Sequence, residues 1–439
     1  MSEDVKIRRW KWIFAGVIVV GVLAVYGGKY VSAWRTWPTE ERMAMGREIF
    51  QREWKPNDPM AGNGDGLGPV FNERSCAACH FQGGVGGGGP SEFNVTAFEV
   101  LPKIGGNEDV FGGVVHKFAT HETLQEVGSK VNERFPPIKG GTRIVNGCEF
   151  AIPQISPVMW STVNTPPLFG LGLIDKMSGR SIAINGLSRA ADSMNRSLDG
   201  DFSSIPVGRV RSLSGGRVGR FGWKGQFATL RDFVASACAV ELGLSNPGQA
   251  QNVPHEYVPN EDAEYDINSE QLNALVCFVE NLPRPEQILP TDPQQRKIAQ
   301  RGEQLFASVG CADCHTPNIG GIEGVYSDFR MYDVDDQLRQ SGYEKPPKEF
   351  ELPSSHPRSN EWKTPPLWGV ADSAPYYHDG SSPSLYSAIM RHGSHAERSR
   401  KKFEKLLHVD QEAVVAFLET LKAPVMPEDD EVVELAAAE

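Results

Sequence analysis

Two short segments of the chain combine two cysteines with a histidine, Cys76-Ala-Ala-Cys79-His80 and Cys311-Ala-Asp-Cys314-His315. In such a segment two thiols on one turn can add to the two vinyl groups of a haem while the adjacent imidazole binds its iron. A zinc site would need a second pair of ligands nearby, and a redox dithiol would not need the histidine. The two segments therefore predict two covalently attached haem c groups, with His80 and His315 as iron ligands.

The group that binds the opposite face of each iron decides between electron transfer and catalysis. The thirty residues after His80 contain no histidine or methionine, and the nearest histidines are His116 and His121. The candidates behind the second motif are His356, His378, His392, His395 and His408. We therefore expect an open or weakly held sixth position at the first haem.

Three further cysteines, Cys148, Cys238 and Cys277, lie outside the two motifs. An odd number of thiols cannot all pair within one chain. At most one internal disulfide is expected, one thiol is left over, and the spacing does not say which.

The elements that must position the two motifs are mainly helical. Helical apolar spacing covers residues 39–50, Ser269–Glu280 and 294–309, and the last of these ends directly before the second motif. Each motif thus follows a helix and a polar connection, so the chain repeats one plan twice. No alternating run is long enough for a large sheet, and residues 91–157 predict only a small hairpin.

Proline-rich punctuation at residues 281–293 marks a domain boundary. We expect a signal peptide or membrane anchor over 1–34, an expanded, loop-rich N-terminal haem c domain over 35–285, a C-terminal haem c domain over 286–425 and an acidic tail over 426–439. The expected fold class is mainly α, with two cytochrome c-like domains and long loops, preceded by an N-terminal export or anchor helix.

The N-terminus has the order of an export signal, with basic residues before an apolar run at 13–27. Val31-Ser-Ala33 would suit a signal peptidase, yet the run with its aromatic flanks nearly spans a bilayer. A cleaved peptide and a retained anchor therefore both stay open. In either case the positive flank stays in the cytoplasm, so we expect the rest in the periplasm or on the extracytoplasmic face of the membrane.

The composition is that of a globular protein, with 439 residues of which 40% are hydrophobic and 9% aromatic. A net charge of -12 provides no basic surface for nucleic acid, so no nucleic-acid partner is expected. An acidic surface suits a basic partner such as a small electron-carrying cytochrome, although such a charge also serves plain solubility.

Five segments resemble the di-haem oxidoreductase family, also labelled thiol oxidoreductases, within the bacterial di-haem cytochrome c peroxidase superfamily. They are FNERSCAACH at 71–80, TPPLFGLGLI at 165–174, VGRFGWKGQFATL at 218–230, GEQLFASVGCADCHTP at 302–317 and KTPPLWGVADSAPYYHDGSSPSLYSAIMRHG at 363–393. The resemblance implies an oxidoreductase enzyme in which the first haem reduces hydrogen peroxide and the second haem feeds it electrons.

The resemblance also places the distal ligand of the second haem at His392, fourteen residues after His378. A histidine there implies a bis-histidine haem with a lower potential than a methionine would give. The alternative is a surface histidine on a helix over 383–392. His378 is expected in the structure around the haem, and Arg220 and Lys363 are expected to pair haem propionates, although exposed cations are the commoner case.

Three residues are implied to act near the first haem. Trp223 stands where the superfamily has a tryptophan between the haems, and core packing is the alternative to an electron relay. Glu241 lies at the approximate place of the distal acid that moves the protons of peroxide, although the match needs a gap and an ordinary helix carboxylate is the alternative. Phe233 replaces a glutamine, which implies a more apolar distal pocket.

The superfamily further holds a calcium ion at the domain interface, and the matching positions are Asn164, Ser373 and Pro375. Oxygen ligands of this kind suit calcium, but three residues cannot complete its shell without water.

Two other functions stay open beside the peroxidase. One is a non-catalytic, membrane-tethered electron-transfer cytochrome c subunit, and the other is oxidative attack on an apolar organic or polymeric substrate. The expected partners are a small electron-donor protein or a respiratory complex, and the membrane if the N-terminal helix is retained.

Overall fold

A computed structural model describes residues 39–425 except for 101–110, 125–127, 138–140, 146–147, 153–155, 199–205, 254–263, 335–356 and 358–359. The expected export segment and the expected acidic tail lie outside these residues. Among the helices of the described ranges, none is long and apolar enough to cross a membrane. The described chain is mainly helical.

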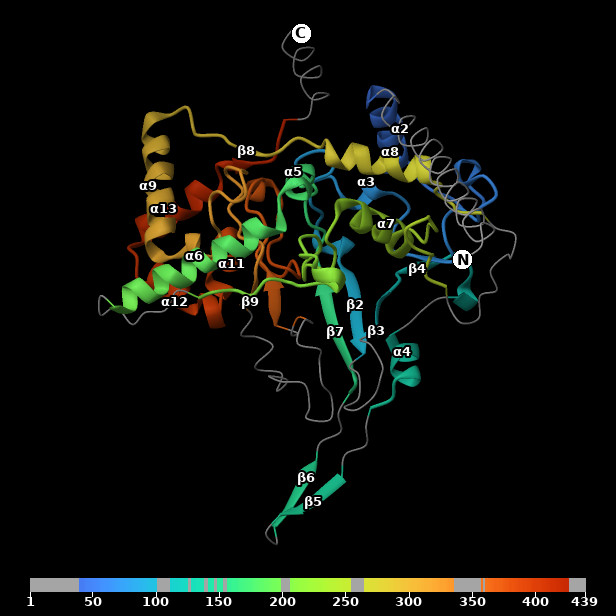
Figure 1. Ribbon diagram of the computed structural model, residues 1–439, viewed down its shortest axis with the longest axis horizontal. Helices are drawn as coiled ribbons and strands as arrows, with labels where there is room; N and C mark the ends of the chain where they lie inside the picture. Colours follow the sequence, from blue (N-terminus) through green and yellow to red (C-terminus); the bar gives the residue numbers. More distant parts are fainter. Residues whose placement is uncertain are drawn as a thin grey trace, which may run out of the picture.

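Two helix pairs repeat the same packing in two units that lie side by side (Figure 1). In the first unit α2 (Thr39–Gln51) packs on α8 (Ser269–Glu280). In the second unit α9 (Pro293–Val309) packs on α13 (His408–Leu418).

One glycine in each pair allows the close approach. A side chain on Gly46 of α2 would overlap the carbonyl oxygen of Ala274 on α8, and one on Gly302 of α9 would overlap the carbonyl oxygen of Ala413 on α13. Close approach of this kind needs a residue without a Cβ. The same contact therefore fixes both helix pairs.

A phenylalanine one turn after each glycine extends the repeat. The ring centroids of Phe50 and Phe278 are 5.2 Å apart, and those of Phe306 and Phe417 are 5.3 Å apart. Phe50 and Phe306 each lie 6.3 Å, between ring centroids, from the histidine of the Cys-x-x-Cys-His motif in their own unit. The helix pair thus forms one wall behind each motif.

Helix α9 shows how the sequence places a motif. The Asp292 side chain accepts a hydrogen bond from the backbone N–H of Gln295, and Pro293 occupies the first turn. Gly310 ends the helix with φ at +98°, a conformation that glycine adopts readily. The chain leaves this turn directly into Cys311.

The first unit carries a long insertion between its motif and α8. In it, β2 (Val95–Val100) pairs antiparallel with β3 (Phe111–Val115) on one side and with β7 (Val158–Val163) on the other. The prediction of a small hairpin in this region was incomplete, because the pairing of β2 with β7 spans a long stretch of chain and leaves no local pattern.

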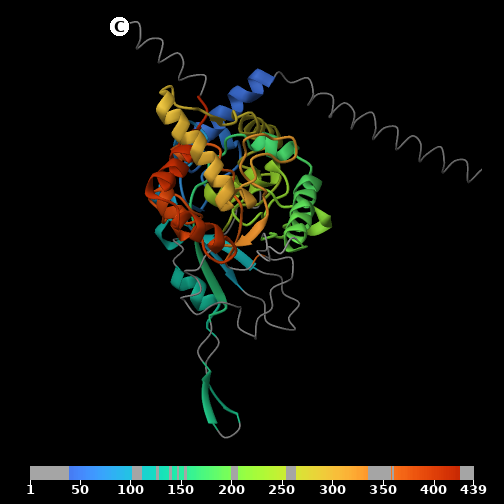
Figure 2. The same ribbon diagram turned by 90° about the vertical axis from the view of Figure 1, so that its left-hand side faces the viewer.

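A second hairpin projects from the body in both views (Figures 1 and 2). It consists of β5 (Gly141–Val145) and β6 (Cys148–Ile152), and it exposes Cys148. None of the seven cysteines, all of which lie in the described part of the chain, is paired in a disulfide, and Cys238 and Cys277 are buried. No disulfide is formed, which lies within the limit of at most one that the odd number of thiols sets.

Helix α6 (Gly179–Leu198) was not predicted. Its Arg189 donates to the carbonyl oxygen of Ala312 and to the hydroxyl of Thr316, on either side of the second motif's histidine. A helix of the insertion thus supports the haem motif of the other unit. Two shorter helices, α5 (Leu171–Lys176) and α7 (Leu230–Glu241), flank it in the chain.

The second unit is closed by its own short strands. Strand β8 (Glu286–Gln287) pairs with β11 (Leu421–Lys422), and β9 (Met331–Asp333) pairs with β10 (Glu361–Lys363). The remaining elements are β1 (Val70–Phe71), α3 (Cys76–Cys79), β4 (Phe118–Ala119), α4 (Gly128–Arg134), α11 (Leu385–Arg391) and α12 (Glu397–Glu404).

The larger hydrophobic core belongs to both units. Residues of α2, α7 and α8 share it with Ile319, Val325, Phe329 and Trp368 of the second unit. The two units are therefore packed against each other through a common core and are not independent domains joined by a linker.

Candidate functional site

The first motif is presented by the short helix α3. The Ser75 side chain caps this helix by accepting from the backbone N–H of Ala78. The Nδ1 atom of His80 lies 3.0 Å from the carbonyl oxygen of Gly87. This contact places the proton on Nδ1 and leaves Nε2 free to bind a metal. Burial lowers the pKa of His80 to about 4, so the imidazole is neutral at neutral pH.

The second motif has the same arrangement. The Nδ1 atom of His315 lies 3.1 Å from the carbonyl oxygen of Tyr326. Burial lowers the pKa of His315 to about 3. Both imidazoles are therefore held in the form that ligates iron, by a carbonyl oxygen a short distance further along the chain.

The chain then passes each motif along the same route. The backbone N–H of Leu168 donates to the carbonyl oxygen of Gly86 at 2.8 Å, and that of Leu367 donates to the carbonyl oxygen of Val325 at 3.1 Å. Both leucines end a Thr-Pro-Pro-Leu segment. Each accepting carbonyl directly precedes the one that faces the histidine, so the two sites share their backbone frame.

The repeat continues into the helices α7 and α11. Thr229 caps α7 by accepting from the N–H of Asp232, and Ser384 caps α11 by accepting from the N–H of Ser387. The cap explains why α11 begins later than the helix that we expected from residue 383, since Ser384 itself has extended backbone angles.

An isolated β-bridge and a residue with left-handed backbone angles precede each of the two cap residues, at the same separation along the sequence. Eight residues before Thr229 the bridge joins Phe221 to Phe227, and eight residues before Ser384 it joins Tyr376 to Ser382. The residue after each bridge start has a positive φ, 79° at Gly222 and 77° at Tyr377. The two segments thus share the bridge, the left-handed residue and the cap, although α7 continues to Glu241 whereas α11 ends at Arg391 and His392 has extended backbone angles.

Counted from the two caps, four pairs of residues hold equivalent places: Trp223 and His378, Lys224 and Asp379, Ser236 and Arg391, and Ala237 and His392. Among these eight residues, His392 is the one whose side chain faces the histidine of a Cys-x-x-Cys-His motif and could bind the same iron. Its counterpart in the first unit is an alanine.

His392 faces His315 across the second site. The two ring centroids are 6.4 Å apart, with an angle of 65° between the ring planes. Imidazoles that bind one metal from opposite faces stand with centres roughly 6 Å apart, since each metal–nitrogen bond measures about 2 Å. The Nδ1 atom of His392 lies 2.7 Å from the carbonyl oxygen of Ala388, which leaves Nε2 for the metal. The pair fits a bis-histidine haem.

A cavity between the two units surrounds this histidine pair. Its lining is mainly apolar and aromatic and includes Cys311, Cys314, His315 and His392. It also brings together nine residues that the sequence singled out: Asn164, Arg220, Trp223, Phe233, Lys363, Ser373, Pro375, His378 and His395. The described lining residues include neither Glu241 nor the first motif.

Trp223 connects the cavity with the first motif. Its indole N–H donates to the backbone carbonyl of Asn164 at 2.8 Å, and the Asn164 side chain donates to the carbonyl of Gly89 at 3.1 Å. Gly89 is two residues from the carbonyl of Gly87 that faces His80. The tryptophan therefore lies in the polar contacts that run from one site to the other.

The two cations predicted to pair propionates differ in their surroundings. Arg220 donates to the backbone carbonyls of Ile174, Asp175, Met177 and Ala228. Lys363 is only 7% exposed, and its ammonium lies 5.5 Å from the ring centroid of Phe329. Burial lowers the pKa of Lys363 to about 8, although Asp328 opposes the effect. A buried ammonium at the cavity wall suits an anionic group of a ligand, whereas Arg220 is already engaged.

His378 is part of the aromatic wall. It is buried and stacks on Trp362 with ring centroids 3.6 Å apart and planes 9° apart. This placement agrees with the expected structural role beside the haem, which stays a prediction. The competing histidine, His395, accepts at Nδ1 from the backbone N–H of Asp333 at 3.3 Å.

Glu241 ends α7 close to the first motif. The side-chain amide of Asn72 donates to its Oε2 at 2.7 Å. Burial raises the pKa of Glu241, and the Asn72 hydrogen bond, followed by electrostatic effects of His116 and Lys117, opposes the rise. The Glu241 charge in turn contributes, after burial and Glu73, to the raised pKa of Cys79.

Phe233, Ala237 and Glu241 are spaced by four residues and so share one face of α7. Phe233 stacks on Phe221 at 6.0 Å between ring centroids and contacts Phe227 at 5.7 Å. This aromatic cluster makes the face apolar at one end and carboxylic at the other.

The calcium site stays a prediction. The Asn164 amide donates to Gly89 and to the side-chain oxygen of Asn94. In the described part of the chain no three His, Cys, Asp or Glu side chains gather closely enough to hold a metal. The predicted calcium ligands are backbone and amide oxygens of Asn164, Ser373 and Pro375, which are not side chains of those four types, so this finding does not test them.

Three residues beside His392 were missed from the sequence, namely Tyr377, Asp379 and Arg391. Their role becomes visible only when the two repeats are compared. Tyr377 has a left-handed backbone conformation, and the equivalent residue of the first unit is a glycine.

Comparison with known proteins agrees with the two-site arrangement. The profile of the di-haem oxidoreductase family, whose description names a peroxidase, matches residues 156–421. No curated protein matches the chain.

Three solved structures illustrate the similarity. Hydrazine synthase of Kuenenia stuttgartiensis is 16% identical, with a TM-score of 0.33 over 60% of this chain and 73% of that chain. A MauG-like protein associated with microbial copper homeostasis is 15% identical, with a TM-score of 0.29 over 58% and 92%. A variant of the diheme peroxidase BthA of Burkholderia thailandensis is 17% identical, with a TM-score of 0.24 over 35% and 49%. On the family profile and its two haem motifs, the chain belongs to the di-haem oxidoreductase family.

Proposed function

We propose that this di-haem oxidoreductase reduces hydrogen peroxide at the haem held by Cys76, Cys79 and His80. Electrons would reach it through the second haem, held by Cys311, Cys314 and the histidine pair His315 and His392. When bound, the two haems supply the storage and transfer of single electrons and an iron that accepts an external ligand. The residues of the chain decide which iron is accessible and how protons move.

The observation that carries the proposal is the difference between Ala237 and His392. Both residues stand eight positions after a cap, Thr229 or Ser384, with Ala237 inside α7 and His392 directly after the end of α11. A methyl group cannot ligate iron, so the first haem would keep a coordination position for peroxide, whereas His315 and His392 would both bind the second iron. This difference supports one reactive centre and one relay.

Glu241 is the residue we assign to proton transfer. It lies one turn beyond Ala237 on the same face of α7 and close enough to the first motif for its charge to affect Cys79, so it would be available to a peroxide bound at the first haem. Its raised pKa suits a group that takes a proton from peroxide and returns it to the departing oxygen. The Asn72 amide fixes the orientation of the carboxylate.

Two further residues serve the second haem and the path between the haems. Lys363 would pair a propionate, since it is a buried cation in the cavity wall. Trp223 would lie on the electron path, since its indole joins the cavity to the segment beside His80. The electron donor we propose is a small redox protein or a respiratory complex on the extracytoplasmic side, where c-type haem motifs of an exported chain would stand.

The test introduces an iron-binding side chain at residue 237 of the first unit, the position that corresponds to His392 in the second unit. In Ala237→His the first haem should become low-spin in absorption and EPR spectra, lose cyanide binding and lose at least a hundredfold of the peroxide turnover. Ser236→His on a neighbouring face of α7 is the control and should keep all three properties. If the histidine prevents folding, Ala237→Met offers a thioether in the same place.

Two results would contradict the proposal. One is an Ala237→His protein that still binds cyanide at the first haem and turns over peroxide like the wild type. The other is a wild-type protein with two six-coordinate, low-spin haems in every redox state, which would favour a non-catalytic electron-transfer cytochrome.

A further inference from the structure

The segment that carries His392 is held by polar and aromatic contacts that the repeat does not require. We infer that Tyr377, Asp379 and Arg391 form a clamp that fixes the orientation of the His392 imidazole as an axial ligand. The inference rests on the proposed ligation of the second haem by His392, and it assigns to these three residues the role of positioning that ligand.

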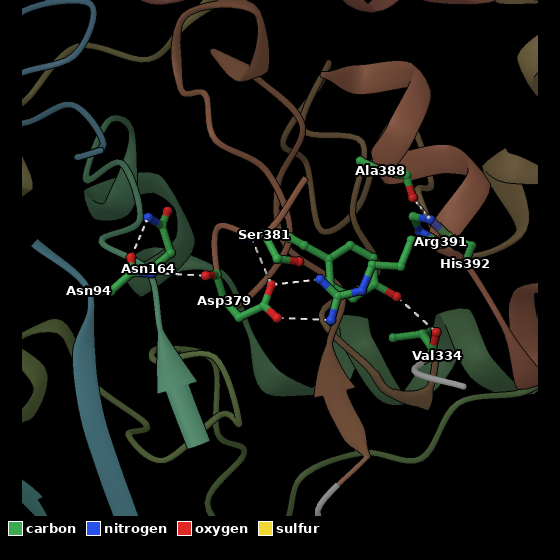
Figure 3. A network of polar contacts seen from close by, with 9 residues as sticks. Asn94, Asn164, Val334, Asp379, Ser381, Ala388, Arg391 and His392 are labelled. Carbon is green, nitrogen blue, oxygen red and sulfur yellow. Dashed lines mark hydrogen bonds and ion pairs between the residues drawn. The ribbon is translucent and has the colours of Figure 1, made fainter. Parts of the chain in front are cut away.

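The first contact of the clamp is an ion pair with two parallel hydrogen bonds. The two terminal nitrogens of Arg391 donate to the two carboxylate oxygens of Asp379 at 2.8 and 2.9 Å (Figure 3). The side chains of Arg391 and Asp379 are only 10% and 20% exposed. Planar, two-fold pairing of this kind fixes a guanidinium in orientation as well as position. Arg391 directly precedes His392, so the pair also fixes the end of α11.

The second contact is aromatic. The Arg391 guanidinium carbon lies 4.2 Å from the ring centroid of Tyr377. The same ring meets the His392 ring edge to face, with centroids 5.6 Å apart and planes at 84°. Tyr377 thus stands between the ion pair and the imidazole and limits the rotation of the imidazole plane.

The third contact anchors both sides of the clamp to one carbonyl. The Tyr377 hydroxyl donates to the carbonyl oxygen of Val334 at 2.8 Å, and the backbone N–H of Gly393 donates to the same oxygen at 2.9 Å. The residue after His392 and the ring beside it are therefore fixed to a common point.

Comparison of the two units argues that these contacts serve the ligand. The places of Tyr377, Asp379, Arg391 and His392 are taken in the first unit by Gly222, Lys224, Ser236 and Ala237. Where the axial histidine is missing, every member of the clamp is missing too.

The backbone of Tyr377 gives independent support. Its φ of 77° lies in the left-handed region, which a bulky residue occupies at a cost of order 1–3 kcal/mol and which the first unit fills with glycine. A tyrosine at such a position indicates that the ring is needed there.

Figure 3 also shows where the clamp is attached to the first unit. The carbonyl oxygen of Asp379 accepts from the Asn94 amide at 2.9 Å, and the oxygen of that amide accepts from Asn164 at 2.8 Å. Asp379 therefore holds Arg391 with its side chain and the insertion of the first unit with its backbone.

The test uses Tyr377→Gly, which introduces the residue that the first unit already has and relieves the strained backbone. We expect a folded protein whose second haem shows shifted and broadened low-spin EPR signals, a changed reduction potential and at least a tenfold higher affinity for added imidazole. Arg391→Lys keeps the charge but not the two-fold pairing and should move the same readouts in the same direction. Tyr386→Ala, on the same helix but packed on Phe403, is the control and should leave them unchanged.

The outcome separates this inference from the proposed function. Unchanged second-haem spectra, potential and imidazole affinity in both Tyr377→Gly and Arg391→Lys would overturn the clamp. If His392→Ala also leaves the second haem unchanged, the ligand assignment itself fails. If His392→Ala opens the second haem while the two clamp variants do not, only the clamp is wrong.

Discussion

Glu241 differs from the other carboxylates of α7 by its surroundings. Asp232 on the same helix is exposed and pairs with Arg217, whereas Glu241 accepts from Asn72 beside the first motif. Because burial raises its pKa, Glu241 stays protonated to a pH above the ordinary value of 4.5. Peroxide turnover should therefore rise with pH through this raised pKa as the carboxylate becomes available as a base.

Replacing Glu241 by glutamine should lower peroxide turnover by a factor of about 10² to 10⁴ and remove the acidic limb of the pH profile. The measurement is steady-state turnover between pH 4 and 8, and Asp232→Asn is the matched control. Unchanged turnover in Glu241→Gln would remove this residue from the mechanism.

Asp266 gives a pH dependence of stability. Its carboxylate accepts from the backbone N–H groups of Gly66 and Ser245, yet burial raises its pKa to about 6 from 3.8. Between these two values the folded state binds more protons than the unfolded state, so stability falls as pH rises from about 4 to 6. The slope of this single group is at most about 1.4 kcal/mol per pH unit.

The comparison that isolates Asp266 is the free energy of unfolding of the wild type and of Asp266→Asn, measured by denaturant at pH 4.5 and 6.5. The wild type should lose stability relative to the variant between the two values. A constant difference would show that the carboxyl has the same pKa in both states.

At the scale of elements, the helix pairs depend on one glycine each. Gly302→Ala would place a methyl group against the carbonyl oxygen of Ala413 on α13. Overpacking of this kind typically costs about 1–3 kcal/mol. We expect a lower unfolding midpoint in denaturant, while Lys297→Ala on the exposed side of α9 should change it little. A midpoint unchanged by Gly302→Ala would mean that α9 and α13 can move apart freely.

The elements that carry the motifs were largely predictable from the sequence. Helix α8 was expected at its observed ends, and α9 began one residue earlier than expected, because caps such as Asp292 and Gly310 are local signals. Helix α6 and the pairing of β2 with β7 were missed because they depend on contacts far apart in the chain. The family assignment from the quoted motifs was confirmed.

The candidate site was predictable where a residue type limits the chemistry. The spacing of the cysteines and histidines in the two motifs identifies them directly as haem-binding residues. His392 could be proposed from its spacing to His378. Tyr377 and Arg391 could not be proposed, since an aromatic and a cation on a helix have many other uses. Only the backbone angles revealed that Tyr377 stands where its counterpart is a glycine.

At the scale of the whole molecule, the shared core joins the two haem sites into one cooperative body. Ile319 and Trp368 of the second unit pack in the same cluster as Phe50 and Leu230 of the first. Thermal unfolding should therefore give a single transition, with coincident midpoints for the absorption of either haem and for the far-ultraviolet circular dichroism. The destabilising Gly302→Ala should shift all three together, and separate midpoints would show independent units.

The long insertion of the first unit has a consequence for how the chain folds. Helices α2 and α8 enclose roughly twice as much chain as α9 and α13, and closing a loop of twice the length costs only about 0.6 kcal/mol of additional chain entropy. The first unit therefore houses a sheet, a projecting hairpin and α6 at little thermodynamic cost. The insertion instead slows the folding of the first unit, because contacts between residues far apart in the chain form late. We expect the second unit to close first during refolding and to provide the surface on which the first unit assembles.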